Sequence, residues 1–331
     1  MALIEKLENI GDAIRSKTGK TDLLTLDEMV TEIGNIETGL GSGGDVSEYF
    51  NTEINENTSS SKSFMGMSVK KMPDLTIGSN VTSMSYAFSG FLGTNIPNLT
   101  ILSTKIKDFS YMFYNCKNIT SVPSLDTSNG TSFNQMFYGC SSLKTIPLIN
   151  TSNGTNFTGM FLSCSSLTEV PLLDTSKGSN FTSLFNGCSS LIEVPSINTS
   201  SGSTLEYTFQ NCSSLTTIPE LNFSKVKNIN SNAFSNCSKL TILGGFFNLG
   251  QSCTYKSSNN SNYILNLSAS TLLTHESLMN VINKLYDLNL TYDVANGGTL
   301  YTQKLVLGST NTAKLTAEEI AIATNKGWTV S

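Results

Sequence analysis

The sequence predicts an elongated repeat solenoid of about eight units of 24–25 residues, with a small helical segment before it and an α/β cap after it. Cysteine recurs every 24 residues, with one step of 25, at Cys116, Cys140, Cys164, Cys188, Cys212 and Cys237. Phenylalanine keeps the same step three residues earlier, from Phe113 to Phe234, and five prolines keep it from Pro123 to Pro219. A fixed period of this length is the signature of stacked coils, each of which pairs with its neighbours.

Residues 1–38 read as two short helices. The first carries an apolar seam with heptad spacing, formed by Leu3, Leu7, Ile10 and Ile14. The second begins at Thr25, which forms a capping box with Glu28, and ends at Gly34. A self-contained helical hairpin is one interpretation. We favour a docking or oligomerisation head, because two helices of this length bury too little surface alone.

Residues 39–62 form a glycine-rich linker and an extended lead-in, and residues 63–250 form the solenoid. Within one unit, Leu143 to Leu148 should be a short strand with inward apolar residues, and residues 150–156 carry turn chemistry. The helical spacing of Phe157, Met160 and Phe161 predicts that a helical or 3₁₀ turn returns the chain. A lone unit buries too few apolar side chains to offset its conformational entropy, so stability must come from stacking.

Residues 251–331 suit an α/β cap for the open end of the solenoid. A helix should begin at Thr274 and bury a face made of Leu278, Val281, Ile282 and Leu285. Residues 300–307 alternate like a strand. A second capping box, Thr316 with Glu319, should start a helix that runs through Thr324 and ends at Gly327.

Composition argues against several classes of protein. The net charge of −5 does not suit a nucleic-acid-binding surface, and Arg15 is the single arginine. No apolar run is long enough to insert into a membrane, and the N-terminus lacks the apolar core of a signal peptide. We therefore expect a protein that is made in the cytoplasm.

Two ladders of side chains invite a metal-site interpretation. The cysteines could bind a metal or form disulfides, but their parallel placement and the absence of a second recurring ligand favour buried thiols, which behave as small apolar groups. Cys253 lies outside the series and is unexplained. The second ladder consists of Asp126, Asn150, Asp174, Asn198 and Asn222. Calcium is one interpretation, but turn-stabilising side chains fit better, because only two members are acids.

Catalytic residues are not predicted. The single histidine, His275, has no partners for a triad or a metal cluster, which favours a surface residue. A paired-acid site made of Glu169 and Glu193 is the enzymatic alternative, but their Thr and Ser surroundings give no reason for a raised pKa. The sequence therefore predicts no cofactor and no bound metal.

The repeat resembles the BspA-type leucine-rich repeat, whose units read MFxxCSSLxxIPxLDTSNxTxFxxMF. The resemblance covers about residues 110–240 closely and 64–110 loosely. It implies a leucine-rich-repeat solenoid, as found in surface adhesins and phage tail proteins. The C-terminal segments LTHESLMNVINKLYDL and KLTAEEIAIATNKGWTVS resemble the tails of repeat proteins from Gram-positive prophages. The N-terminal segment IGDAIRSKTGKTDLLTLDEMVTEI resembles a leader on phage tail proteins.

These resemblances imply a non-enzymatic phage tail or baseplate protein, receptor binding by its repeats, and a location in the virion tail. The outward strand positions would then contact a host glycan or surface protein, and they are Lys144, Thr145, Thr168, Glu169, Glu193, Thr216 and Thr217. Residues 1–38 would bind other tail proteins and form a homo-oligomer, with a trimer favoured. A bacterial surface adhesin and a purely structural virion decoration are the alternatives.

Overall fold

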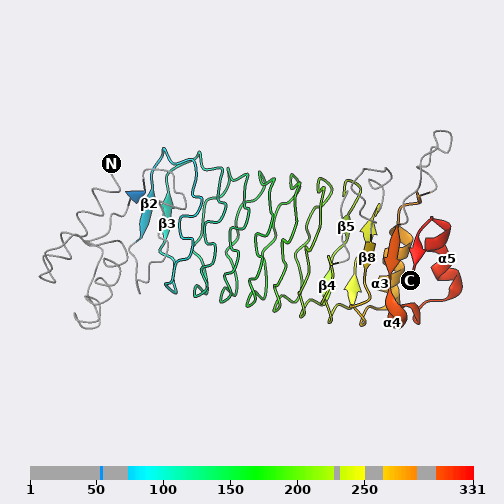
Figure 1. Cartoon of the computed structure of the whole chain (residues 1–331). Coiled ribbons are helices and arrows are strands. Elements are labelled where there is room, and N and C mark those ends of the chain that lie inside the picture. The colour runs from blue at the N-terminus through cyan, green and yellow to red at the C-terminus, as the bar shows by residue number, and fades with distance from the viewer. Residues whose placement is uncertain (1–52, 55–73, 227–231, 250–263, 289–302) are drawn as a thin grey trace, which may run out of the picture.

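The protein is a tube of stacked coils that ends in a small helical cap, as the computed structural model shows (Figure 1). The structure describes residues 53–54, 74–226, 232–249, 264–288 and 303–331. Each coil is one sequence repeat, and neighbouring coils run parallel to one another. The predicted parallel solenoid is therefore confirmed.

The ladder of strands begins earlier than the sequence predicts. Strands β1 (Glu53–Ile54), β2 (Leu75–Ile77) and β3 (Leu99–Ile101) form a parallel sheet in the order β1-β2-β3. Glu53 pairs with Thr76, and Leu75 pairs with Leu99. A strand thus lies inside the segment 39–62 that was expected to be a lead-in. The oligomerisation residues Leu3, Leu7, Ile10 and Ile14, and also Cys253, lie outside the described residues.

The middle coils pair without regular strands. No strand is assigned between Ile101 and Thr217, a stretch that the structure describes completely. The prolines contribute to this difference from the predicted strands, because a proline has no N–H to donate to the coil before it. In the last repeat Gly244 takes the proline position, and its N–H donates to the Ile218 carbonyl at 2.9 Å.

Regular pairing accordingly returns at that repeat. Strands β4 (Thr217–Ile218) and β5 (Leu221–Asn222) lie on either side of Pro219. They pair in parallel with β6 (Ile242–Leu243) and β7 (Phe246–Phe247), respectively.

The segment that returns the chain is not the predicted helical or 3₁₀ turn. Along residues 133–139, alternate amides leave the coil: the N–H groups of Phe133, Gln135, Phe137 and Gly139 donate to carbonyls of the next coil at 2.8–3.0 Å. The N–H groups of Met136 and Tyr138, which lie between them, donate three residues back within the same coil. A helix would direct every amide back along its own axis, and no donor would remain for the neighbouring coil.

Left-handed residues produce this alternation. Gln135 has a φ of 51° and Gly139 a φ of 71°, and the same two positions of the next coil, Gly159 and Ser163, have φ values of 55° and 62°. Non-glycine residues rarely adopt this conformation, because Cβ then crowds the following carbonyl. The hydrophobic spacing suggested a helix because it reports which side chains face inward and does not report the sign of φ.

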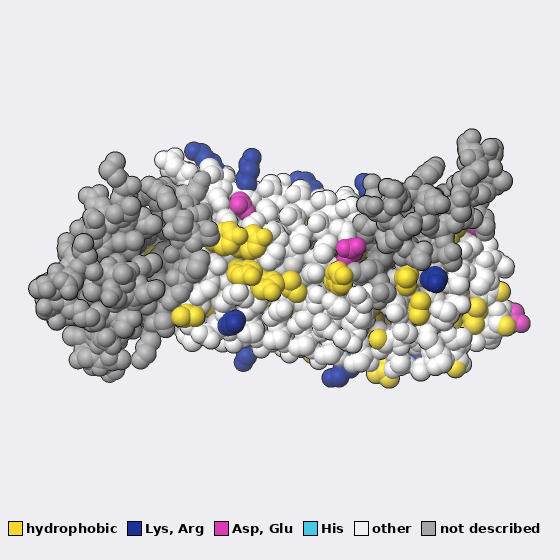
Figure 2. Space-filling view, viewed as in Figure 1, with side chains coloured by type: hydrophobic (Ala, Val, Ile, Leu, Met, Phe, Trp, Pro, Cys, Tyr) yellow, Lys and Arg dark blue, Asp and Glu magenta, His cyan; other side chains and the backbone are white. Residues whose placement is uncertain are grey.

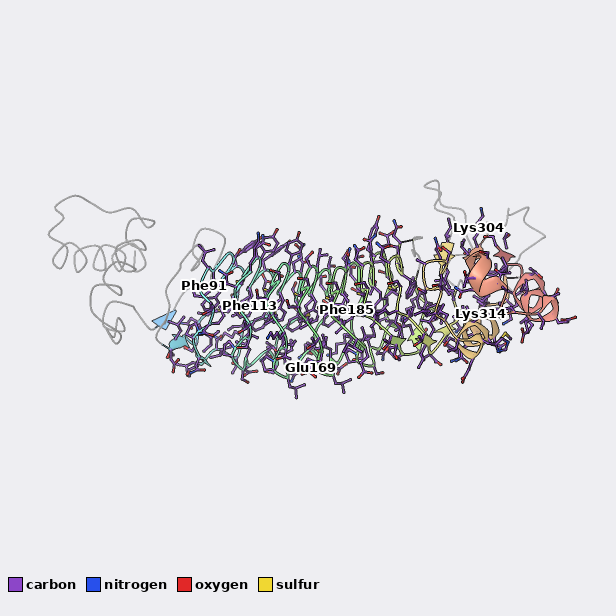
Figure 3. The ribbon with its side chains drawn as sticks, turned by 90° about the horizontal axis from the view of Figure 1, so that it is seen from below. Phe91, Phe113, Glu169, Phe185, Lys304 and Lys314 are labelled. Carbon is purple, nitrogen blue, oxygen red and sulfur yellow. The ribbon has the colours of Figure 1, made fainter. Side chains whose placement is uncertain are left out.

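Two columns of phenylalanine rings fill the tube. In one column, rings from Phe88 to Phe234 stack at centroid distances of 5.5–6.0 Å. In the other, Phe109, Phe133, Phe157 and Phe181 stack at 5.7–5.9 Å. All of these rings are buried. Figure 3 shows Phe113 and Phe185 inside the coils and Glu169 at the outer edge.

The C-terminal cap contains the predicted helices. Helix α3 (His275–Lys284) has Thr274 as its N-cap, and it buries the predicted face of Leu278, Val281, Ile282 and Leu285. Helix α5 (Ala317–Asn325) begins with the predicted capping box of Thr316 and Glu319. The remaining elements are β8 (Ile264–Asn266), β9 (Lys304–Val306), α4 (Gly308–Thr312) and β10 (Thr329–Val330), and the strands form a parallel sheet in the order β10-β9-β8.

Helix α3 covers the end of the solenoid by packing against β6 and β7. Gly245 permits this close approach: its φ is 99°, and a Cβ there would lie 2.9 Å from the Asn280 carbonyl oxygen. Lys284 donates to the Gly244 carbonyl at 2.9 Å and forms an ion pair with Glu220. Lys326 donates to the Asn283 carbonyl at 2.7 Å, at the negative end of the helix dipole.

Candidate binding surface

The cysteine ladder is part of the packing. All six thiols of the series are buried and unpaired, and each Sγ donates to the carbonyl of a phenylalanine one coil earlier, at 2.9–3.1 Å. Burial raises the pKa of Cys164 and of Cys237 to about 12, so both thiols stay protonated. A protonated, buried thiol is neither a metal ligand nor a nucleophile, which supports the structural interpretation.

The Asp/Asn ladder stabilises turns. The side-chain oxygens of Asp126 and Asp174 each accept the N–H two residues further on, at 3.0 Å, and the asparagines do the same. The hydrogen bond from the Ser128 N–H lowers the pKa of Asp126, and hydrogen bonds from Ser176 lower that of Asp174. Within the described ranges, no three His, Cys, Asp or Glu side chains are grouped closely enough to hold a metal.

Buried threonines add a further ladder beside these turns. Thr127, Thr175 and Thr199 are buried, and their hydroxyls donate to carbonyls of the next coil at 2.7–3.0 Å. The regular period of the sequence therefore reflects the internal structure: cysteines, phenylalanines and threonines join one coil to the next, and Asp and Asn stabilise the turn within each coil.

His275 belongs to the cap. Its imidazole is exposed, and its Nε2 lies 2.8 Å from Oε1 of Glu319, which links the first turns of α3 and α5. The N–H of Thr316 and then the His275 side chain lower the pKa of Glu319. His275 is thus a surface residue, as the sequence predicts, and its partner belongs to a capping box.

The surface left for binding is the outer wall, defined as three columns of outward residues on the strand side of the coils. The first column contains Thr120, Lys144, Thr168, Ile192, Thr216 and Thr241. The second contains Ser121, Thr145, Glu169, Glu193, Thr217 and Ile242. The third, which follows the prolines, contains Ser124, Leu148, Leu172, Ser196 and Glu220. The composition of all three changes from coil to coil, in contrast to the interior.

The seven predicted contact residues all lie in the first two columns. Lys144, Thr168, Glu169 and Glu193 are exposed, whereas Thr145, Thr216 and Thr217 are half-buried. Two of the hydroxyls serve the fold: Thr168 Oγ1 donates to the Lys144 carbonyl at 3.3 Å, and Thr216 Oγ1 donates to the Ile192 carbonyl at 3.0 Å. Among these seven residues, the side chains that project freely are therefore mainly the charged ones.

Sequence reasoning did not assign the most exposed apolar side chains of the wall. Leu148 is 71% exposed and Leu172 is 65% exposed, and they occupy the same column in adjacent coils. Ile192 is 54% exposed in the coil that follows. Figure 3 places Glu169, and with it this wall, on the side of the tube that faces away from the viewer in Figure 2, so the hydrophobic side chains seen along the middle of the coils in Figure 2 belong to the other side. An alignment of the repeats could have indicated this patch, because Leu148 and Leu172 stand where other repeats have Ser or Glu.

Four half-buried tyrosines lie together on the turn segments of the first coils. Tyr86 stacks on Tyr111 at 4.6 Å, Tyr114 stacks on Tyr138 at 4.7 Å, and Tyr111 meets Tyr114 edge to face. Each ring therefore has one face covered by its partner. Because the rings cover one another, this cluster extends the internal stacking to the surface.

A family model matches most of the described repeats. Residues 82–193 and 131–246 match a family model described as "Mycoplasma protein of unknown function, DUF285". This match supports a repeat protein of the BspA type. A solved leucine-rich repeat protein from Eubacterium ventriosum is 25% identical, with a TM-score of 0.37 over 56% of this chain. The matched region covers 45% of that protein. No curated protein matches the chain. None of the described helices has the length and apolar content to span a bilayer.

Proposed function

We propose that this BspA-type repeat solenoid is a non-enzymatic attachment protein, which binds its target through the outer wall. One observation carries the proposal: the regular residues of the repeat join neighbouring coils or stabilise the turn within a coil, whereas the outward residues of the wall differ between coils. A surface that varies over a constant interior is what a repeat protein offers for recognition. Lys144, Glu169 and Glu193 are its exposed charged residues in the central coils.

We further propose that the protein belongs to the tail or baseplate of a phage or phage-like particle. The terminal segments support this form, because they resemble segments of prophage repeat proteins and phage tail proteins. Residues 1–38 would bind other tail proteins and form a homo-oligomer, with a trimer favoured. The wall would contact a glycan or a protein on the host surface, after synthesis of the chain in the host cytoplasm.

A bacterial surface adhesin is the second candidate, because the matched repeat family is a cellular one by its description. The two candidates differ in where the protein is found. Labelling of the C-terminus on whole particles should place it at the tail tip if it attaches the particle. A label along the tube or on the head would instead indicate a structural decoration. Detection on intact, unlysed cells would favour the adhesin.

Adsorption of particles tests the wall itself. Replacing Lys144, Glu169 and Glu193 by Ala should slow adsorption, because these side chains supply the exposed charge of the central wall. In a matched control, Lys107 and Glu206, which lie on the turn segments, are replaced by Ala. Particles that carry this variant should adsorb normally. Unchanged adsorption of the triple variant would show that this part of the wall is not the contact surface.

A further inference from the structure

An apolar patch lies at the centre of the outer wall. Leu148 and Leu172 are the two most exposed large hydrophobic side chains in the described part of the chain, at 71% and 65%. They occupy equivalent positions in adjacent coils, whose backbones are separated by roughly the 4.8 Å spacing of neighbouring strands. Ile192, 54% exposed, lies in the next coil but in the first column, four residues before the position equivalent to Leu172. Single exposed leucines are common on proteins, but neighbouring ones form a continuous surface that a partner can cover.

The fold does not require leucine at these positions. The same column has Ser124 before the pair, and Ser196 and Glu220 after it. All of these repeats form the same coil, with an inward leucine or isoleucine immediately after the column position. The two leucines are therefore a local feature of the central coils, and their exposed surface contributes nothing to the buried core.

Charged residues surround the patch unevenly. Glu169 and Glu193 are exposed in neighbouring coils of the second column, three residues before Leu172 and Ser196. Among the described residues, neither carboxylate takes part in an ion pair. Lys144 is exposed beside the first of these coils. An apolar centre with a charged rim is the arrangement of protein interfaces, and the two free carboxylates favour a basic group on the partner.

We propose that this patch binds a protein segment that carries aliphatic or aromatic side chains next to Lys or Arg. This inference rests on the proposed function for the choice of the outer wall, and it names the class of partner. A glycan fits the patch less well. Its exposed apolar side chains are aliphatic and offer no aromatic face, and the Thr168 and Thr216 hydroxyls donate to backbone carbonyls.

A displayed library of random peptides tests the partner class with the purified full-length protein. Selected peptides should combine apolar residues with Lys or Arg. The variant Leu148→Ser/Leu172→Ser should weaken their binding by about tenfold or more, as expected for residues at the centre of an interface. Serine already occupies this column in other coils, so the variant should fold normally. Glu169→Gln/Glu193→Gln should weaken binding and reduce its dependence on salt.

Leu272→Ser provides the matched control, because Leu272 is 55% exposed but lies in the cap. Its peptide binding should equal that of the unaltered protein. Equal binding of the selected peptides to the Leu148→Ser/Leu172→Ser variant would overturn the proposal, and so would a selection that yields no peptide dependent on this pair. Either result, together with slower adsorption of the Lys144/Glu169/Glu193 variant, would leave the wall as the attachment surface and exclude a protein segment at this patch.

Discussion

The buried thiols should make the solenoid unstable in alkaline solution. Burial raises the pKa of Cys164 and of Cys237 to about 12, from an ordinary value of 9.0. Because the folded-state pKa lies above that of the unfolded chain, the contribution of each thiol to stability is complete below pH 9. It is lost progressively as the pH rises from about 9 to about 12.

The size of the effect follows from the two pKa values. At pH 10 the unfolded chain has released most of the thiol protons, whereas the folded chain retains them. Each of the two thiols then lowers the free energy of unfolding by about 1.4 kcal/mol relative to neutral pH, and the pair by about 3 kcal/mol. The pKa values of Cys140, Cys188 and Cys212 are raised in the same direction by burial, so the whole protein should lose more.

Urea unfolding at pH 7.5 and pH 10, followed by circular dichroism, measures this loss. The control is the Cys164→Ala/Cys237→Ala variant, which should be less stable at neutral pH but should lose about 3 kcal/mol less between the two pH values. Other groups that titrate in this range, such as Tyr86, are present in both proteins. If the two proteins lost the same free energy, the thiols would not be buried and protonated, and the packing role assigned to the ladder would be wrong.

Three further changes test the coil and the cap. Ser163→Gly should stabilise the protein by about 0.5–1 kcal/mol, because φ is 62° there and the equivalent positions of adjacent coils carry Gly; a lower melting temperature would contradict this. Gly245→Ala should destabilise the cap by about 1–3 kcal/mol, since its Cβ would meet helix α3. The fluorescence of Trp328, the single tryptophan and a buried residue, should report that loss. Thr316→Ala should cost about 1 kcal/mol by removing the capping box, with the same fluorescence readout.

Much of the interior could be predicted from the sequence, because the recurrence of particular residue types shows both the length of the repeat and which side chains are buried. The steps of 24 residues place Cys164, Phe161 and Asp174 in register, and the structure shows each in the ladder expected of it. The cap helices were predictable from Thr274 and Thr316, since capping residues and apolar spacing are local signals.

The hydrogen bonds between coils could not be predicted in the same way. The inward spacing of Phe133 and Phe137 is compatible with a helix, and nothing in the side chain of Gln135 reveals a positive φ. The exposure of Leu148 and Leu172 was also missed, because a leucine in a strand pattern is normally read as inward. Within the outer wall, the sequence identifies outward positions but does not show which hydroxyls the neighbouring coil uses.

Helix α3 covers the last repeat of the solenoid, and this affects how the number of repeats can change. Helix α3 packs on a final repeat whose sequence differs from the others. Gly244 and Gly245 stand there at the positions of Pro219 and Glu220 in the repeat before. Whole repeats can therefore be gained or lost in the middle of the tube without changing the repeat that contacts α3. Each such event would move the two ends apart or together by roughly one strand spacing of about 4.8 Å. The length of the solenoid therefore depends on the number of repeats.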